Sequence, residues 1–368
     1  MVCDGSRKVS ADSVALLQQF DLEIGCYEDF CSTTADLIKR LLSSKKIEVH
    51  SISSRCKDRQ SFNKKIVKKS HYKELPDITD LAGIRIITHY SDDVDLIAKL
   101  IEKEFEIDRG NSIDKRLILD PDRFGYLSLH YVASLKNTRS KLQEYSDYEG
   151  LKVEIQIRSI LQHTWAEIEH DIGYKNEFEV PGPIKRKFSR LAGLLELADQ
   201  EFISIRNEID KYSKVLDRQM KTSVKNFGLD ALSYEKFVTR NAVSLQADQD
   251  VCRAGNYEIS HYKDESRMVS RLAGFDITTI ERLSFLLQEN KSNILRMVSA
   301  LRGLPDEDPE NDPDEPSIVS PGISTFFLMH VLTARKSPED IESYLQENSW
   351  LDSPGGDEFY EILVGFFQ

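Results

Sequence analysis

The spacing of apolar and polar positions predicts a first half in which strands and helices alternate. Amphipathic helical periodicity is expected over residues 11–44, 61–70, 94–104 and 183–216. Period-two alternation and short apolar runs predict four strands, at 46–56, 83–88, 127–135 and 151–158. Residues 106–123 are polar and irregular, which indicates a mobile loop. The interleaving favours an α+β fold, a mixed β-sheet flanked by helices.

The second half of the chain has mostly helical periodicity. Residues 268–301 predict two or three short amphipathic helices, and Thr278 and Glu281 have the spacing of a capping box. Ser337 followed by Pro338 marks another helix start, because serine caps a helix and proline fits its first turn. This half therefore predicts a mostly α-helical domain.

Charge divides the chain at about the same point. Residues 221–368 contain 14 Lys and Arg against 25 Asp and Glu, a net charge of −11, whereas residues 1–220 contain 35 against 37, a net charge of −2. The acidic, proline-rich tract 304–316 cannot bury a core and predicts a mobile linker. We expect two domains, at 10–218 and 222–368. The contrast hints at different partners for the two, although a well-solvated acidic module is the simpler explanation of the charge.

The segment 154–175 carries the most informative pattern. It opens as a strand in which Glu154, Gln156 and Arg158 share one face and two isoleucines share the other. A helix follows, in which Trp165 belongs to an apolar stripe, and a polar stripe lies beside it: His163, Glu167, His170 and Tyr174. The polar stripe could hold a metal, but packing around a site is the stronger interpretation. A carboxylate, an amide and a guanidinium on one strand face predict a site for a charged ligand.

Cysteine usage and apolar runs indicate the compartment. The five cysteines are odd in number and never form a Cys-x-x-Cys pair, which argues against a disulfide framework and for a reducing cytosol. The longest apolar run, residues 322–332, is too short and too broken to span a bilayer. Residues 1–7 show no hydrophobic core of a signal peptide. We expect a cytoplasmic protein with no membrane partner.

Four clusters of residues carry candidate chemistry. They are Arg55, Lys57, Ser61 and Lys65; Asp80 and Arg85; Tyr126 and His130; and Glu154 with Gln156. Two carboxylates together with clustered cations suit a site for Mg²⁺ and a polyphosphate, where the protein positions phosphates and neutralises developing charge. Tyr126 follows Gly125, a turn residue, and such a ring suits stacking on a base, with burial as the rival interpretation.

In order and spacing, these clusters resemble the synthetase domain of the RelA/SpoT family, the (p)ppGpp synthetases, over about residues 10–216. The resemblance implies a mixed sheet related to that of nucleotidyltransferases. It also implies transfer of the β,γ-pyrophosphate of ATP to the ribose 3′-hydroxyl of GDP or GTP. Only about 45 residues precede the first expected strand, so the resemblance is to a short, synthetase-only member with a helical extension.

The resemblance assigns the donor side of such a site. Arg55 and Arg85 correspond to the arginines that sandwich the adenine of ATP. Lys57, Ser61 and Lys65 correspond to contacts with the ATP phosphates.

The same resemblance assigns the metal and the acceptor. Asp80 corresponds to the Mg²⁺ ligand, and Glu154 to the carboxylate that helps to hold the metal and acts as general base on the 3′-hydroxyl. Tyr126 corresponds to the ring that stacks on the acceptor guanine. His130 and Gln156 correspond to polar groups that line the acceptor site.

Departures from the family pattern leave the acceptor open. Leu127 stands where Arg or Gln is usual, Phe124 where many members have Asn, and Ser159 where Thr is usual. An alternative is a toxin-type relative that pyrophosphorylates the 3′ end of tRNA, restrained by its C-terminal domain or by an antitoxin. A catalytically silent nucleotide sensor is a third interpretation, which retention of both Asp80 and Glu154 disfavours. Self-association and a regulatory role for the C-terminal domain are further expectations.

Overall fold

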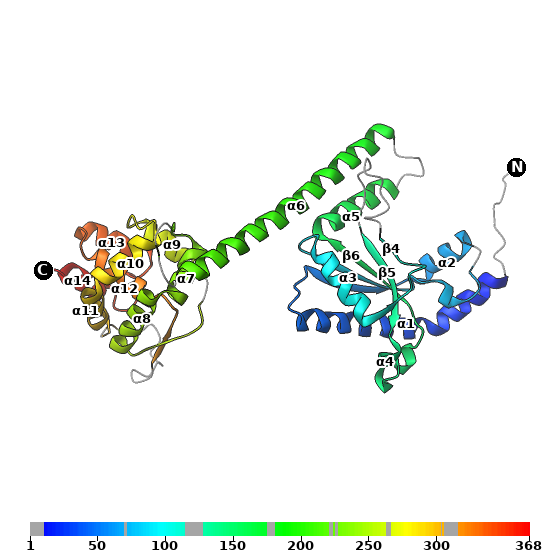
Figure 1. Cartoon of the computed structure of the whole chain (residues 1–368), viewed down its shortest axis with the longest axis horizontal. Helices are drawn as coiled ribbons and strands as arrows, with labels where there is room; N and C mark the ends of the chain where they lie inside the picture. The colour runs from blue at the N-terminus through cyan, green and yellow to red at the C-terminus, as the bar shows by residue number, and fades with distance from the viewer. Residues whose placement is uncertain are drawn as a thin grey trace. The chain divides into compact units, whose positions relative to one another are not determined.

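The computed structural model of the chain describes two compact units (Figure 1). The described residues are 11–69, 72–114, 128–174, 181–220, 224, 227–262, 266–302, 304 and 316–368. The first unit is residues 1–207 and the second residues 208–368. The division falls inside one helix, α6 (Gly182–Gln219), and not at the expected 218–222, because Leu216 and Met220 are fully buried in the core of the second unit.

A mixed β-sheet forms the centre of the first unit. Its strands are β1 (Ser51–Cys56), β2 (Ala82–Thr88), β3 (Phe105–Ile107), β4 (Ile113–Asp114), β5 (Leu129–Leu135) and β6 (Val153–Ser159). They lie in the order β1-β2-β6-β5-β3, with β4 also paired to β5. Only the β2–β6 pair among these described strands is parallel. The predicted mixed sheet flanked by helices is confirmed.

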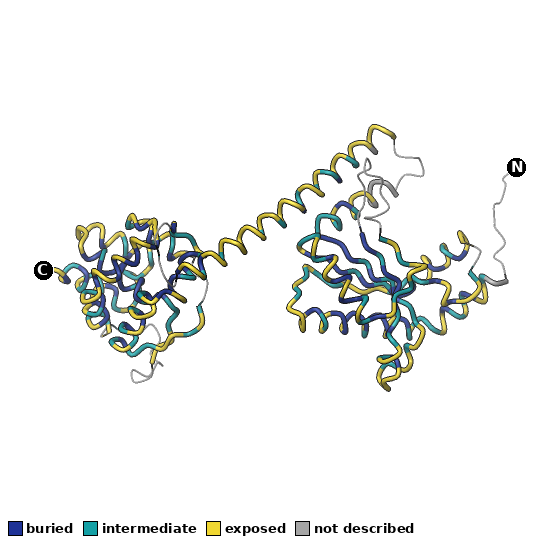
Figure 2. The backbone as a smooth tube through the Cα atoms, viewed as in Figure 1, coloured by how far each residue is buried: buried dark blue, intermediate teal, exposed yellow. Residues whose placement is uncertain are grey.

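The apolar face of this sheet is covered by helices. The helical elements of the unit, besides α6, are α1 (Ala11–Ser44), α2 (Arg59–Lys68), η1 (Leu75–Asp77), α3 (Asp93–Glu104), α4 (Asn137–Ser140), η2 (Gln143–Tyr148) and α5 (Ile160–Tyr174). Phe30 and Ile38 of α1 are fully buried in one core with Ile84 of β2 and Ile155 of β6. Buried positions gather along the central strands (Figure 2). Because side chains alternate along a strand, the polar residues of β2 and β6 point to the opposite face.

Two expectations for the first unit are corrected. The strand expected at 46–56 begins only at Ser51. The segment expected to be an irregular loop at 106–123 contains β3 and β4, while residues 115–123 lie outside the described part of the chain. Both strands pair with β5, whose backbone supplies their hydrogen bonds. A pattern of only two or three residues does not predict such pairing.

The second unit is mostly helical. Its helices are α7 (Ala231–Arg240), α8 (Ala242–Gly255), α9 (Ser266–Ala273), α10 (Ile280–Glu289), α11 (Lys291–Leu301), α12 (Ile323–Thr333), α13 (Pro338–Glu347) and α14 (Gly356–Gly365). A parallel pair of short strands, β7 (Tyr257–Ile259) and β8 (Ser317–Val319), was not expected. The predicted linker lies almost wholly outside the described residues.

Helix caps in this unit follow the sequence closely. The Ser337 side chain accepts a hydrogen bond from the Asp340 backbone N–H at the start of α13, as predicted. At α10 the cap is Thr279 and not Thr278, since the Thr279 hydroxyl accepts from the Arg282 N–H. The apolar run at 322–332 forms α12, where Leu328, Met329 and Val331 are fully buried in the core. Within the described residues, no helix has the length and apolarity needed to cross a membrane.

Candidate active site

The polar face of the sheet brings the sequence-predicted residues into register. Arg85 of β2 lies opposite Gln156 of β6, which lies opposite His130 of β5. One pleat away, Gly83 lies between Arg55 on β1 and Glu154 on β6. Residues directly opposite on paired strands project to the same face. Side chains far apart in the sequence therefore form two adjacent rows on one surface.

A cavity of about 360 Å³ opens over these rows. Its wall contains most of the predicted site residues: Arg55, Lys57, Ser61, Asp80, Arg85, Glu154 and Gln156. Gly83 also lines it. A β-carbon at Gly83 would lie 3.6 Å from the Arg55 carbonyl oxygen, which is an ordinary van der Waals contact.

Asp80 is held between two lysines at one end of the cavity. Its Oδ2 lies 3.0 Å from Lys57 Nζ, and its Oδ1 lies 2.6 Å from Lys65 Nζ. Burial raises the pKa of Asp80, but the hydrogen bonds and charges of Lys65 and Lys57 outweigh burial and hold this pKa below its usual value. The carboxylate is therefore ionised at neutral pH, and the ammonium groups of both lysines point toward it.

Glu154 belongs to a hydrogen-bonded chain that leads away from the cavity. Its Oε1 lies 2.7 Å from His130 Nδ1, and His130 Nε2 lies 2.6 Å from the Ser128 hydroxyl. Burial raises the pKa of Glu154, but the hydrogen bond and charge of His130 outweigh burial, so this pKa is lowered. His130 thus fixes the orientation of the Glu154 carboxylate and stabilises its charged form.

Arg85 is oriented by the helix that follows β6. Its Nη1 lies 3.0 Å from Glu167 Oε1 on α5, and His163 Nδ1 lies 3.6 Å from the same oxygen. On the neighbouring strand, Arg158 Nη2 donates to Gln156 Oε1 at 3.1 Å. The polar stripe of α5 therefore packs around the site through Glu167, while the side chain of His170 lies outside the described part of the chain.

Ser61 reaches the cavity because of the way α2 begins. Asp58 is the N-cap of this helix and accepts a hydrogen bond of 2.9 Å from the Ser61 backbone N–H. The first turn of a helix carries partial positive charge and favours anions. The Ser61 side chain therefore lines the same cavity as Lys57 and Asp80.

The donor set fits a magnesium ion shared with a substrate. Asp80 and Glu154 line the same cavity, and the negative charge of Asp80 acts to raise the pKa of Glu154. A divalent cation relieves repulsion between carboxylates, and Mg²⁺ commonly takes one or two carboxylates and completes its shell with water and phosphate oxygens. The described residues contain no group of three or more potential His, Cys, Asp or Glu ligands, so phosphates and water would complete the shell.

Sequence reasoning located most of this site and missed some of its members. His130, expected at the acceptor, contacts Glu154 directly, and Lys65 reaches the site through Asp80. Tyr126, with Phe124 and Leu127, lies outside the described residues. Ser128, Asp58 and Glu167 were not assigned roles in the site. Only Glu167 left a sequence signal, its position in the polar stripe of α5.

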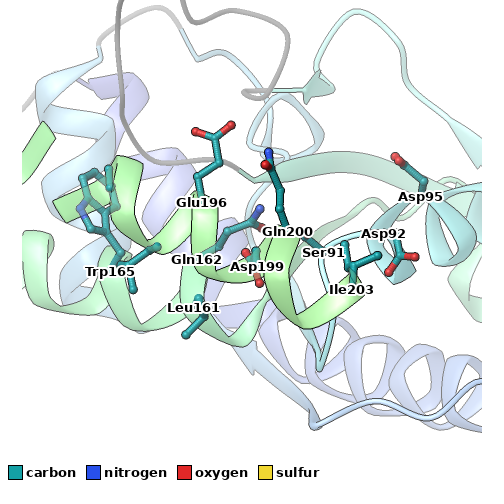
Figure 3. Close-up of a pocket in the computed structure, with 12 residues that line it drawn as sticks. Ser91, Asp92, Asp95, Leu161, Gln162, Trp165, Glu196, Asp199, Gln200 and Ile203 are labelled. Carbon is teal, nitrogen blue, oxygen red and sulfur yellow. The ribbon is translucent and has the colours of Figure 1, made fainter. Parts of the chain in front are cut away.

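A second hollow of about 320 Å³ lies elsewhere in the first unit, against α5 and α6 (Figure 3). Trp165 and Leu161 line it together with four carboxylates: Asp92, Asp95, Glu196 and Asp199. An anionic substrate would be repelled there. The cavity over β2 and β6, with Arg55, Lys57 and Arg85 on its wall, is the one whose chemistry suits a polyphosphate.

Cations and two carboxylates, one of which is paired with a histidine, gather at one sheet face and suit phosphoryl-type transfer to a hydroxyl. A family model described as "Region found in RelA / SpoT proteins" matches residues 54–179, which include every site residue named above. GTP pyrophosphokinase YwaC of Bacillus subtilis is 30% identical over 161 residues, which cover 43% of this chain and 73% of that protein. The chain belongs to the RelA/SpoT family.

A second curated relative agrees with this assignment. GTP pyrophosphokinase YjbM of Bacillus subtilis is 29% identical over 166 residues, covering 43% of this chain and 74% of that protein. Among solved structures, small alarmone synthetase 1 from Bacillus subtilis bound to its product pppGpp is 25% identical, with coverage of 52% of this chain and 98% of that one and a TM-score of 0.44. The fold described above rests on the strand order and not on this structural similarity.

Proposed function

We propose that this protein is a GTP pyrophosphokinase, which transfers the β,γ-pyrophosphate of ATP to the 3′-hydroxyl of GDP or GTP. The proposal is supported by the names of the two Bacillus subtilis relatives, each of which covers 43% of the chain. The observation that carries it is that Asp80 and Glu154 line the same cavity. Asp80 is held there between Lys57 and Lys65, and Glu154 pairs with His130.

The cations position the donor. Arg55 and Arg85 project from adjacent strands, and we assign them to the two faces of the adenine ring. Lys57, Ser61 and Lys65 would contact the phosphates, so that the bond between the α- and β-phosphates lies near Asp80. Guanidinium and ammonium groups at these positions stabilise the charge that the departing AMP acquires.

Glu154 would accept the proton of the acceptor 3′-hydroxyl. As the oxygen attacks the β-phosphorus of ATP, a new P–O bond forms and the α,β-bridging bond breaks, releasing AMP. The lowered pKa of Glu154 keeps it ionised, and the contact with His130 at 2.7 Å holds the carboxylate in place to accept that proton. Gln156, two residues beyond Glu154 and next to it on the same strand face, would orient the acceptor.

Asp80 and Glu154 would together hold a Mg²⁺ ion, which when bound neutralises charge on the transferred phosphates. Their shared cavity supports this assignment. We also propose a cytoplasmic location, supported by described cysteines that are all free thiols: Cys26, Cys31, Cys56 and Cys252.

The test is transfer of label from ATP. The purified chain would be given ATP labelled at the γ-phosphate with Mg²⁺ and one of three acceptors, GDP, GTP or deacylated tRNA. Label on the guanosine nucleotide supports the proposal, and label on tRNA would instead identify the toxin-type activity. Binding of ATP without transfer to any acceptor would refute both and favour a silent sensor.

A further inference from the structure

We propose that the second unit carries its own binding site for a nucleoside phosphate, in the cavity between α9 and α13. This cavity measures about 720 Å³, the volume of a small-molecule site. Its walls come from α9, the turn at Gly274 and Phe275, Lys336, and the outer face of α13. The site lies entirely within residues 208–368 and is separate from the cavity proposed for pyrophosphate transfer.

Three cations converge on this cavity: Arg267, Arg271 and Lys336. Within the described residues none of the three has a carboxylate within ion-pair distance, although residues 221–368 carry a net charge of −11. By contrast, Lys291 of the same unit pairs with Asp250 at 2.6 Å. Cations that gather without ion-paired carboxylates on one concave surface of an acidic module create a local attraction for an anion.

Aromatic rings form the wall between these cations. The Lys336 ammonium lies 4.6 Å from the centre of the Phe275 ring, and the Arg271 guanidinium lies 5.3 Å from that of Trp350. Tyr344 meets Phe275 edge-on, with ring centres 6.0 Å apart. Half-exposed rings beside cations suit a ligand that has both phosphate and a flat base, since every base can stack through its π-face.

The remaining lining residues add hydrogen-bonding groups and a limit on charge. Ser270, Ser343 and Asn348 line the cavity and supply hydroxyl and amide groups suited to ribose or base edges. Two carboxylates, Asp340 and Glu347, also line it, and Asp340 already accepts a hydrogen bond of 2.8 Å from the Ser337 hydroxyl. Three cations against two carboxylates favour a ligand with few phosphates and exposed hydroxyl groups.

The wall of the cavity is continuous with a rigid aromatic cluster. The Tyr344 hydroxyl lies 3.1 Å from Nδ1 of His330. His330 is fully buried, and its ring centre lies 5.2 Å from that of Trp350. Burial, and then the charge of Arg271, lower the pKa of His330 to about 3, so the ring is neutral. A ligand that takes up the charge of Arg271 would therefore alter the surroundings of Trp350, and Trp350 can report on binding.

Trp350 fluorescence gives the test. The chain has two tryptophans, so the Trp165→Phe variant leaves Trp350 as its only tryptophan. This full-length variant would be titrated with GDP, ATP, guanosine and inorganic pyrophosphate. We expect a saturable change in Trp350 fluorescence with the nucleotides. The affinity should be at least tenfold weaker for guanosine, which lacks phosphate, and for pyrophosphate, which lacks the base. Equal affinity for pyrophosphate and GDP would overturn the assignment of a base site.

Variants locate the binding. Replacing both Arg267 and Lys336 by Gln should weaken nucleotide affinity at least tenfold, whereas Arg253→Gln, on the exposed surface of α8, should leave it unchanged. An Arg55→Gln variant, altered in the other cavity, should also keep the Trp350 response. No saturable change at millimolar nucleotide, or an unaltered one in the double variant, would refute the site. None of these results depends on pyrophosphate transfer.

Equilibrium dialysis of labelled GDP covers the case in which Trp165→Phe unfolds. With both tryptophans retained, the Arg267→Gln, Lys336→Gln double variant should bind one fewer equivalent of GDP than the unaltered chain. The melting temperature of each variant would confirm that it is folded. An identical number of bound equivalents would overturn the proposal.

Discussion

Glu154 and His130 should behave as one catalytic unit. The two side chains meet at 2.7 Å in a half-buried setting, where a hydrogen bond to a charged group contributes about 1.5–3 kcal/mol. Loss of a positioned general base typically lowers a rate by about 10²- to 10⁴-fold, or roughly 2.7–5.4 kcal/mol. We therefore expect Glu154→Gln to lower kcat by about that factor, and His130→Ala to lower it by about 10- to 150-fold.

The double variant decides whether the pair is coupled. If His130 acts only through Glu154, the combined variant should have a kcat within about threefold of Glu154→Gln alone. Independent action would multiply the two losses. His89→Ala removes an exposed histidine outside the site and serves as the matched control. The assay is transfer of label from ATP to GDP, with KM for ATP measured alongside.

The pH profile separates positioning from mere packing. In the unaltered chain the hydrogen bond from His130 holds the pKa of Glu154 below its usual value, so activity should persist as the pH falls toward 5. Without His130, burial is opposed only by the smaller effect of the Gln156 hydrogen bond, and the pKa of Glu154 rises. The acidic limb of the rate profile should therefore move to higher pH in His130→Ala. Multiplicative losses together with an unmoved acidic limb would refute the coupled pair.

Three further changes test other contacts. Because the pKa of Asp80 is lowered, its charge stabilises the fold above its ordinary pKa of 3.8, and this contribution is lost as the pH falls through the lowered value. Scanning calorimetry between pH 5 and pH 3 should therefore show a smaller fall in melting temperature for Asp80→Asn than for the unaltered chain. An equal fall in the two proteins would contradict the pairing of Asp80 with the lysines. Glu167→Gln should change KM for ATP by less than about fivefold and leave kcat unchanged, because the pair with Arg85 is partly exposed and such pairs contribute about 0–1 kcal/mol; a tenfold loss of kcat would argue against this. Ser337→Ala should reduce the free energy of unfolding by about 1 kcal/mol and Ser337→Gly by only a few tenths, measured by urea denaturation, and equal losses would exclude capping as the cause.

The sequence predicted those elements whose pattern is local. Alternation along 151–158 identified the polar face of β6, and the cap at Ser337 identified the start of α13. The strands β3, β4, β7 and β8 were not predicted, because they have only two or three residues and exist through their partners. A short pattern cannot be distinguished from a loop when its stabilising hydrogen bonds lie in another segment.

Contacts within the site depended on register, which the sequence does not display. Both residues of the Glu154–His130 pair were identified, yet their contact follows from the pairing of β5 with β6. Glu167 was visible in a helical stripe, but its ion pair with Arg85 requires α5 to pack against β2. A sequence motif therefore identifies the residues of a site more readily than the contacts between those residues.

The strand order also dictates when the site can come into existence. β1 and β2 follow one another among the strands of the chain and can pair early, whereas β6 must pair in parallel with β2, about 70 residues upstream, and with β5. A chain emerging from the ribosome therefore has no complete catalytic face until Ser159 is free to join the sheet. Synthesis of most of the first unit precedes any possible turnover, and an interrupted translation product that stops before β6 should be unable to carry out transfer.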